Sequence, residues 1–186
     1  VRADQVEAVN ARLSQLGVTT NAGVEVKLIS NAGHEAFIGR ETKGAYTLQV
    51  DASGVTIVGR DNYGVFNGLQ SLASLVTVGS TELPKVTVDY DAPRFDYRGM
   101  HMDVSRNFQT KEQVLKFLDQ MAAYKMNKFH FHLADDEGWR LEIPGLPELT
   151  DIGAKRCHDL DETTCLLPQL GSGPDQAAEK QYYSVA

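Results

Sequence analysis

The sequence predicts a small, sandwich-like α+β domain followed by the beginning of an α/β fold. Residues 1–92 mix short alternating patterns, typical of strands, with amphipathic helical stripes. The turn-forming run Asp91-Ala92-Pro93 marks a boundary between the two parts. Residues 93–186 begin with a strand, a 15-residue helical pattern and a second strand. This order is typical of a βαβ unit with parallel strands and a right-handed crossover.

The first domain is expected to be a sheet with helices on one face. A helix is predicted over residues 2–17, and a second helix begins at Asn62 as its capping residue. A four-residue loop, DASG, is expected to join the middle two strands into a hairpin. The predicted strands span residues 24–29, 45–50, 55–59 and 85–90. No cluster of polar residues occurs in this part of the sequence, so we expect its role to be structural.

In the second domain, the strand patterns YRGMHMDV and KFHFHLA flank a helix with a capping box formed by Thr110 and Gln113. A complete (β/α)₈ barrel needs roughly 250 residues, so a barrel that starts here would continue beyond this sequence. After Leu141 the chain is predicted to be mainly loop. The sequence begins at Val1 without a signal-peptide pattern, so we expect a processed form or a piece of a longer protein.

Composition narrows the choice of partners. The 186 residues carry a net charge of −7, with an isoelectric point of about 5.2. That acidity argues against a nucleic-acid partner, and no apolar run approaches the roughly 18 residues of a membrane span. Cys157 and Cys165 lie in a polar loop, CHDLDETTC. They are either free thiols in a reducing compartment or a local disulfide. Because exposed thiols are a liability, we favour the disulfide and a location outside the cytoplasm.

Period-two alternation separates two faces of the second pair of strands. His101 and Asp103 share one face of the first strand, and His130 and His132 share one face of the second. The opposite face of the second strand is apolar and suits packing against helices. It carries Phe129, Phe131 and Leu133. The polar face is therefore expected to line the interior of the fold.

Charged residues follow the ends of both strands. Arg106 comes just after the first strand, and Asp135, Asp136 and Glu137 come just after the second. The carboxyl ends of parallel strands are where α/β folds place their active sites. An arginine beside carboxylates at this edge provides a rigid donor for hydroxyl groups or a carboxylate. We therefore expect a binding site there, although paired aspartates more often form a solvated turn or a helix cap.

Two further interpretations stay open at this point. His130 and His132, with Asp135, have the arrangement of a metal site in a barrel hydrolase, although a hydrogen-bonded histidine pair is the commoner reading. Trp139 either packs beneath the loop or offers a face on which a sugar stacks, and packing is favoured.

Long motifs give the sequence a family resemblance. The stretches YRGMHMDVSRNF, LDQMAAYKMNKFHFHLADDEGWRLEIPGLPELTDIG and KRCHDLDETTCLLPQLGSGPD resemble the family 20 glycoside hydrolases, the β-N-acetylhexosaminidases, and among them the bacterial chitobiases. GRDNYGVFNGLQSLASL is similar to the helix of the α+β domain that precedes the barrel in that family. The resemblance covers nearly the whole chain. It implies that residues 93–186 form the first part of an incomplete (β/α)₈ TIM barrel.

The resemblance also implies a function. Such enzymes remove terminal N-acetylglucosamine from chitobiose and related oligosaccharides with retention, using the acetamido oxygen of the sugar as the nucleophile. Arg106 is expected to bind sugar hydroxyls, and Asp135 and Asp136 to hold this arginine and the sugar. Neither a metal nor a cofactor is needed. The loop of Cys157 and Cys165 is similar to a loop that carries a disulfide in chitobiases, and a periplasmic or secreted location is implied.

One departure from the family pattern limits what this chain does alone. The catalytic Asp-Glu pair of the family follows a His-x-Gly-Gly motif, which these 186 residues do not contain. The steps Asp136-Glu137 and Asp161-Glu162 lie in another context. We therefore expect the acid/base to be in the remainder of the polypeptide and the chain to be inactive alone. The alternatives are part of a metal-dependent barrel hydrolase and a non-catalytic sugar-binding module.

Overall fold

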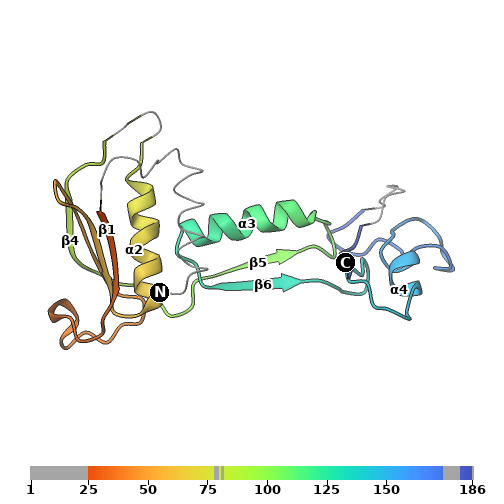
Figure 1. The fold of residues 1–186 in the computed structure, drawn as a ribbon. Helices are drawn as coiled ribbons and strands as arrows, with labels where there is room; N and C mark the ends of the chain where they lie inside the picture. The colour runs from red at the N-terminus through yellow and green to blue at the C-terminus, as the bar shows by residue number, and fades with distance from the viewer. Residues whose placement is uncertain (1–24, 78–79, 81, 174–180, 186) are drawn as a thin grey trace. The chain divides into compact units, whose positions relative to one another are not determined.

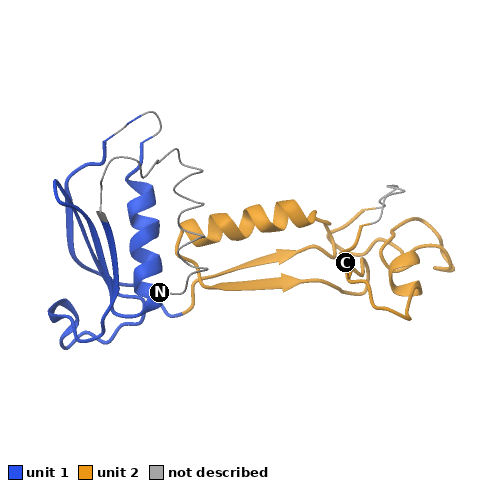
Figure 2. Cartoon of the chain, in the orientation of Figure 1, with its two compact units in different colours: residues 1–96 blue, residues 97–186 orange. Residues whose placement is uncertain are grey.

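The computed structural model describes residues 25–77, 80, 82–173 and 181–185. The chain forms two compact units that divide between Asp96 and Tyr97 (Figure 2). The helix expected over residues 2–17 lies outside the described residues, so the structure does not test it.

The first unit contains a four-stranded mixed sheet in the order β1-β3-β2-β4. β1 runs parallel to β3, while β2 is antiparallel to both β3 and β4. Helix α2 (Asn62–Ser74) lies along one face of this sheet (Figure 1). The strands are β1 (Glu25–Ser30), β2 (Tyr46–Asp51), β3 (Gly54–Gly59) and β4 (Val86–Asp91). The four predicted strands and the second predicted helix are confirmed.

An apolar core fills the space between α2 and the sheet. Leu48 and Ile57 point inward from neighbouring strands and are completely buried. Gly68 lets α2 come close to the strands, because a Cβ at this position would lie 2.5 Å from Cγ2 of Ile57. Further buried members of this core are Tyr46, Val50, Val55, Val65, Leu69 and Leu72. A smaller cluster of Phe37, Ala45 and Val58 includes a residue of the 3-10 helix η1 (Glu35–Phe37).

Two local details of the first unit differ from the prediction. The cap of α2 is Asp61, not Asn62: its carboxylate accepts the amide hydrogen of Gly64 at 2.9 Å. The hairpin loop has two residues, not four, because Asp51 and Gly54 still pair across the strands. Gly54, with φ at 134°, adopts a backbone conformation that other residues rarely reach.

The second unit begins with the strand, helix and strand that the sequence predicts. β5 (Gly99–Asp103) and β6 (Lys128–His132) are parallel, and α3 (Lys111–Ala123) connects them. Figure 1 shows α3 running beside the two strands. The Thr110–Gln113 capping box is present at its start. The ring of Phe117 on α3 lies 5.8 Å from that of Phe129 on β6, between centroids. The apolar face of β6 therefore meets the helix, as expected.

The segment after β6 is largely loop but contains a short helix, α4 (Glu148–Asp151), that the sequence reading did not predict. Single bridges join Leu141 to Tyr183 and Arg156 to Leu166. The Tyr183 ring packs against Phe108 and Phe131, and its hydroxyl donates to the carbonyl of Gln109 at 2.6 Å. Among the described residues, no helix has the length and apolar character needed to cross a membrane.

Candidate functional site

Arg106 is the centre of a polar cluster at the carboxyl ends of β5 and β6. Its Nη1 donates to Oδ2 of Asp135 at 2.6 Å and to Oδ2 of Asp103 at 3.1 Å. The same nitrogen lies 3.4 Å from Nε2 of His132. The backbone amide of Arg106 donates to Oδ1 of Asp103 at 3.1 Å, so one carboxylate holds both the main chain and the side chain. The guanidinium group is therefore fixed while 26% of the side chain stays exposed.

The environment keeps both carboxylates around Arg106 ionised. Desolvation raises the pKa of Asp103, but the backbone hydrogen bond and the charge of Arg106 outweigh it and lower the pKa below its ordinary value. The pKa of Asp135 is also lowered, first by the amide hydrogen bond from Asp136 and then, against a desolvation penalty, by the side chain of Arg106. Ionised carboxylates only accept hydrogen bonds, so they orient the donors of the arginine.

Asp136 has a different setting from its neighbour. The backbone amide of Asp136 donates to Oδ1 of Asp135 at 2.8 Å, and Asp136 itself is exposed. The structure therefore brings Arg106 and Asp135 into direct contact, whereas Asp136 joins the cluster through its backbone. An exposed carboxylate at this edge remains available to a ligand hydroxyl.

Glu137 is the buried carboxylate beneath the cluster, and 1% of its side chain is exposed. Its Oε2 accepts the amide hydrogen of Gln169 at 3.1 Å and the hydroxyl of Ser172. Its Oε1 lies 3.8 Å from Nε of Arg106, and its Oε2 lies 3.8 Å from Nη1 of Arg156. Within the described part of the chain, Oε1 accepts no hydrogen bond. Glu137 therefore places a buried negative charge between two arginines.

Arg140 joins separate loops from a completely buried position. Its guanidinium donates at 2.8 Å to the carbonyl oxygens of Val104, Ser105 and Ala154, and at 3.0 Å to that of Gln181. Four backbone acceptors from three stretches of sequence are thereby satisfied by one side chain.

The turn before Arg140 depends on a glycine. Gly138 has φ at +63°, and a Cβ there would lie 2.2 Å from the carbonyl oxygen of Ser105. Only a residue without a side chain fits that approach, which brings the loop after β6 against the end of β5.

A disulfide closes the loop that follows. Cys157 and Cys165 are bonded, with their Cα atoms 5.8 Å apart, which confirms the predicted pair. Within this loop the carboxylate of Asp159 accepts hydrogen bonds from the amides and hydroxyls of Thr163 and Thr164. These bonds, led by the hydroxyl of Thr164, lower the pKa of Asp159 to about 2. Next to the loop, Nη1 of Arg156 donates to the carbonyl of Arg106.

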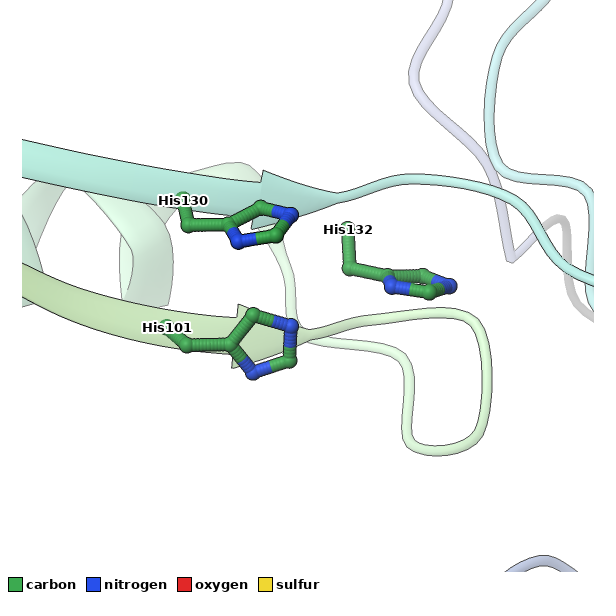
Figure 3. A group of neighbouring side chains, drawn as sticks. All are labelled: His101, His130 and His132. Atoms are coloured by element: carbon green, nitrogen blue, oxygen red, sulfur yellow. The ribbon is translucent and has the colours of Figure 1, made fainter.

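Three histidines project from the same side of β5 and β6 (Figure 3). His101 and His130 are directly opposite in register, with ring centroids 4.6 Å apart. His132 lies two residues further along β6, and its Nε2 is 2.8 Å from Oδ2 of Asp135. One interpretation of the sequence was a metal site formed by His130, His132 and Asp135. The structure places His101 in that group as the third imidazole.

Trp139 is half-buried rather than part of the core. Its indole nitrogen donates to the carbonyl of Leu141 at 2.5 Å, and its amide donates to the carbonyl of Gly153 at 2.8 Å. Both contacts fix the loop, and the choice between packing beneath it and stacking on a sugar stays a prediction.

The sequence reading did not identify Glu137 and Arg140 as buried. Both lie in the polar run DDEGWR, which has the composition of a solvated loop. The one available signal was Gly138 between them, because a glycine in a short polar run often marks a tight backbone approach. Their partners at residues 154, 169, 172 and 181 are too far along the chain to be predicted from a pattern.

The fold and the cluster define a class of protein: an α/β unit with a fixed arginine–carboxylate group at the carboxyl ends of its parallel strands. Comparison with known families narrows this class. Residues 95–185 match the catalytic domain of glycosyl hydrolase family 20, and residues 1–90 match domain 2 of that family. The chain belongs to glycosyl hydrolase family 20.

Individual relatives agree with this assignment. The chain is 61% identical over 173 residues to a β-hexosaminidase of Vibrio vulnificus, a match that covers 93% of the chain and 20% of the relative. It is 49% identical over 174 residues to the N,N'-diacetylchitobiase of Vibrio harveyi, covering 92% of the chain and 19% of that protein. The chain therefore spans about a fifth of the length of these relatives.

A solved structure of the family has the same fold. The exo-β-N-acetylglucosaminidase of Vibrio harveyi in complex with N-acetylglucosamine superposes with a TM-score of 0.72 at 30% identity. The match covers 98% of this chain and 28% of that one. The structural likeness thus extends over both units.

Proposed function

We propose that this chain is part of a retaining exo-β-N-acetylhexosaminidase that removes terminal N-acetylglucosamine from chitobiose and other chitooligosaccharides. Membership of family 20 supports this activity, as do the names of the relatives, which are a β-hexosaminidase and a diacetylchitobiase. In the proposed reaction the acetamido oxygen of the substrate attacks the anomeric carbon while the glycosidic C–O bond breaks and a general acid protonates the leaving oxygen. Water then opens the cyclic intermediate, so no enzymic nucleophile is needed.

Arg106 binds hydroxyl groups of the non-reducing sugar in this proposal, and Asp135 and Asp136 hold the arginine and the sugar. The 2.6 Å contact between Nη1 of Arg106 and Asp135 is the observation that carries the assignment. The contact fixes one donor nitrogen of the Arg106 guanidinium group and leaves part of the side chain exposed. A donor fixed in advance loses little side-chain entropy when a sugar binds.

The two units have separate roles in the proposal. Residues 1–92 are the α+β domain that precedes the barrel, and residues 93–186 supply the first two strands, β5 and β6, of an incomplete (β/α)₈ barrel. The family matches at 1–90 and 95–185 support this division. The other strands come from the remainder of the polypeptide. The Cys157–Cys165 disulfide supports a periplasmic or secreted location.

The acid/base of the reaction lies outside these residues in the proposal. Glu137 is the glutamate of an Asp-Glu step, but its side chain is buried and bonded to the loop of Gln169 and Ser172. A general acid has to reach the oxygen of the leaving group, and this burial argues against that role. The 186-residue chain alone is expected to leave a chromogenic N-acetylglucosaminide uncleaved.

Replacement of Arg106 in the intact enzyme tests the proposal. Loss of charged hydrogen bonds worth about 1.5–3 kcal/mol predicts that Arg106→Ala lowers kcat/KM about 10- to 150-fold. Arg106→Lys keeps the charge but not the fork, so only part of the activity should return. Arg94→Ala removes an exposed arginine before β5 and serves as the control. Unchanged kinetics in Arg106→Ala would remove Arg106 from the binding site.

A further inference from the structure

His101, His130 and His132 form a compact group of imidazoles on the polar side of β5 and β6 (Figure 3). One nitrogen from each ring lies within 4.8 Å of those of the other two. The rings of His101 and His130 meet edge to face, with an interplanar angle of 86°. His132 lies 5.8 Å from His101 and 6.4 Å from His130, between ring centroids. One nitrogen of each imidazole thus lies in the same small region.

The backbone positions of these ligands are rigid. His101 and His130 are paired residues of a parallel ladder, and His132 follows on the same face of β6. Sites built on strands are held more precisely than sites on loops. An ion with Zn–N of about 2.0–2.1 Å needs ligand nitrogens closer together than the 4.8 Å limit observed here, so ion binding would involve side-chain rotation toward a common point.

The contact between His132 and Asp135 has the form of an outer-shell interaction. Nε2 of His132 lies 2.8 Å from Oδ2 of Asp135 and 3.4 Å from Nη1 of Arg106. In the tautomer with the proton on Nε2, this nitrogen donates to the carboxylate and Nδ1 has a lone pair for a metal. Histidine ligands in metal sites commonly donate their second nitrogen to a carboxylate in this way.

We propose that His101, His130 and His132 form a binding site for one divalent transition-metal ion of the Zn²⁺ type. Three neutral imidazoles are a ligand set that suits Zn²⁺, Cu²⁺ or Ni²⁺ and not Mg²⁺ or Ca²⁺, which prefer oxygen ligands. The fourth position is left to water or another small ligand. The site is separate from the proposed hydrolysis, which proceeds without a metal.

Direct binding measurements on the intact, chelator-treated protein test the site. Zn²⁺ is titrated by calorimetry, and Co²⁺ replaces it as a spectroscopic probe of the ligand geometry. We expect one ion per chain. His101→Ala and His130→Ala should each weaken the affinity by at least about tenfold, since even loss of an outer-shell partner typically costs 10- to 100-fold.

Matched variants separate the site from adventitious binding. His158→Ala removes an exposed histidine from the disulfide loop and should bind Zn²⁺ as the wild type does. Asp135→Asn should weaken binding through His132. The more conservative His101→Asn replaces His101→Ala if far-UV circular dichroism shows that the alanine variant does not fold. The proposal is overturned if the intact protein binds no Zn²⁺, or if the His101 variants and His158→Ala have the same affinity. Because binding is read directly, either outcome is independent of hydrolytic activity.

Discussion

The core of the first unit and the loops of the second unit differ in how many charged side chains they bury. The sheet and α2 of the first unit enclose an apolar core, in which Leu48 and Ile57 have 1% and 0% exposure. Asn67 is the one buried polar residue in the described part of that unit. The loops of the second unit instead bury Glu137, Arg140 and Arg156. The first unit thus relies on removal of apolar surface from water, whereas these loops rely on satisfied polar groups.

This difference separates a scaffold from a site. A hydrophobic core is non-directional and tolerates substitutions that conserve volume. A buried guanidinium bonded to several carbonyls fixes each loop in one position, because its donors have set directions. The end of β5 next to Arg106 is held in this second way. The buried polar side chains of the second unit are therefore what position the candidate binding group.

The largest expected effect is at Arg140. Arg140→Met keeps much of the volume but leaves three buried carbonyl acceptors, and the half-buried one of Gln181, without their donor. Each unsatisfied group costs about 1–3 kcal/mol, so the free energy of unfolding should fall by about 4 kcal/mol or more. Chemical denaturation of the intact protein measures this change. Arg94→Met, at an exposed arginine, should have little effect. Equal stability of the two variants would show that the loops do not depend on Arg140.

A somewhat smaller loss is expected in the apolar unit. Ile57→Ala leaves a cavity in the completely buried core and should cost about 3 kcal/mol, within the usual range of 2–5 kcal/mol. Ile38→Ala, at a side chain that is 75% exposed, is the control from the same unit. The same denaturation experiment compares them. Because the core is apolar, Ile57→Val should recover most of the stability; a failure to do so would point to a specific shape requirement.

The two regions also differ in how much of their structure could be predicted from the sequence. The core of the first unit repeats with the periods of strand and helix, so β1 to β4 and α2 were predicted from the pattern, whereas the short helix η1 was not. Two details there were predicted wrongly. The cap of α2 is Asp61 instead of Asn62, and the hairpin loop has two residues instead of four. In the second unit the strand faces and the capping box were predicted. The burial of Glu137 and Arg140 was not, since their partners come from distant loops whose placement has no periodic signal.

A substitution at Glu137 tests whether its buried carboxylate positions Arg106. Glu137→Gln keeps the shape but removes the negative charge 3.8 Å from Nε of Arg106 and from Nη1 of Arg156. In the intact enzyme we expect kcat/KM to fall about tenfold, equivalent to about 1.4 kcal/mol. If Arg106 acts in substrate binding, the substitution should raise KM and leave kcat nearly unchanged. Glu112→Gln, at an exposed position on α3, is the control. A fall in kcat alone would instead connect Glu137 with the chemical step.

The smallest expected effect is a local response to acid in the disulfide loop. The folded-state pKa of Asp159 is about 2, below its ordinary value, because Thr163 and Thr164 donate to the charged form. A lowered pKa stabilises the loop above the unfolded-state value near 4 and loses that effect as pH falls toward 2. Amide hydrogen exchange at Thr163 and Thr164 should therefore gain protection, relative to intrinsic rates, as pH rises from about 2 to 4. Asp159→Asn should abolish this pH dependence, while the disulfide keeps the loop closed. If the variant retained it, another carboxylate would be the source, and the loop would depend less on Asp159 than its hydrogen bonds indicate.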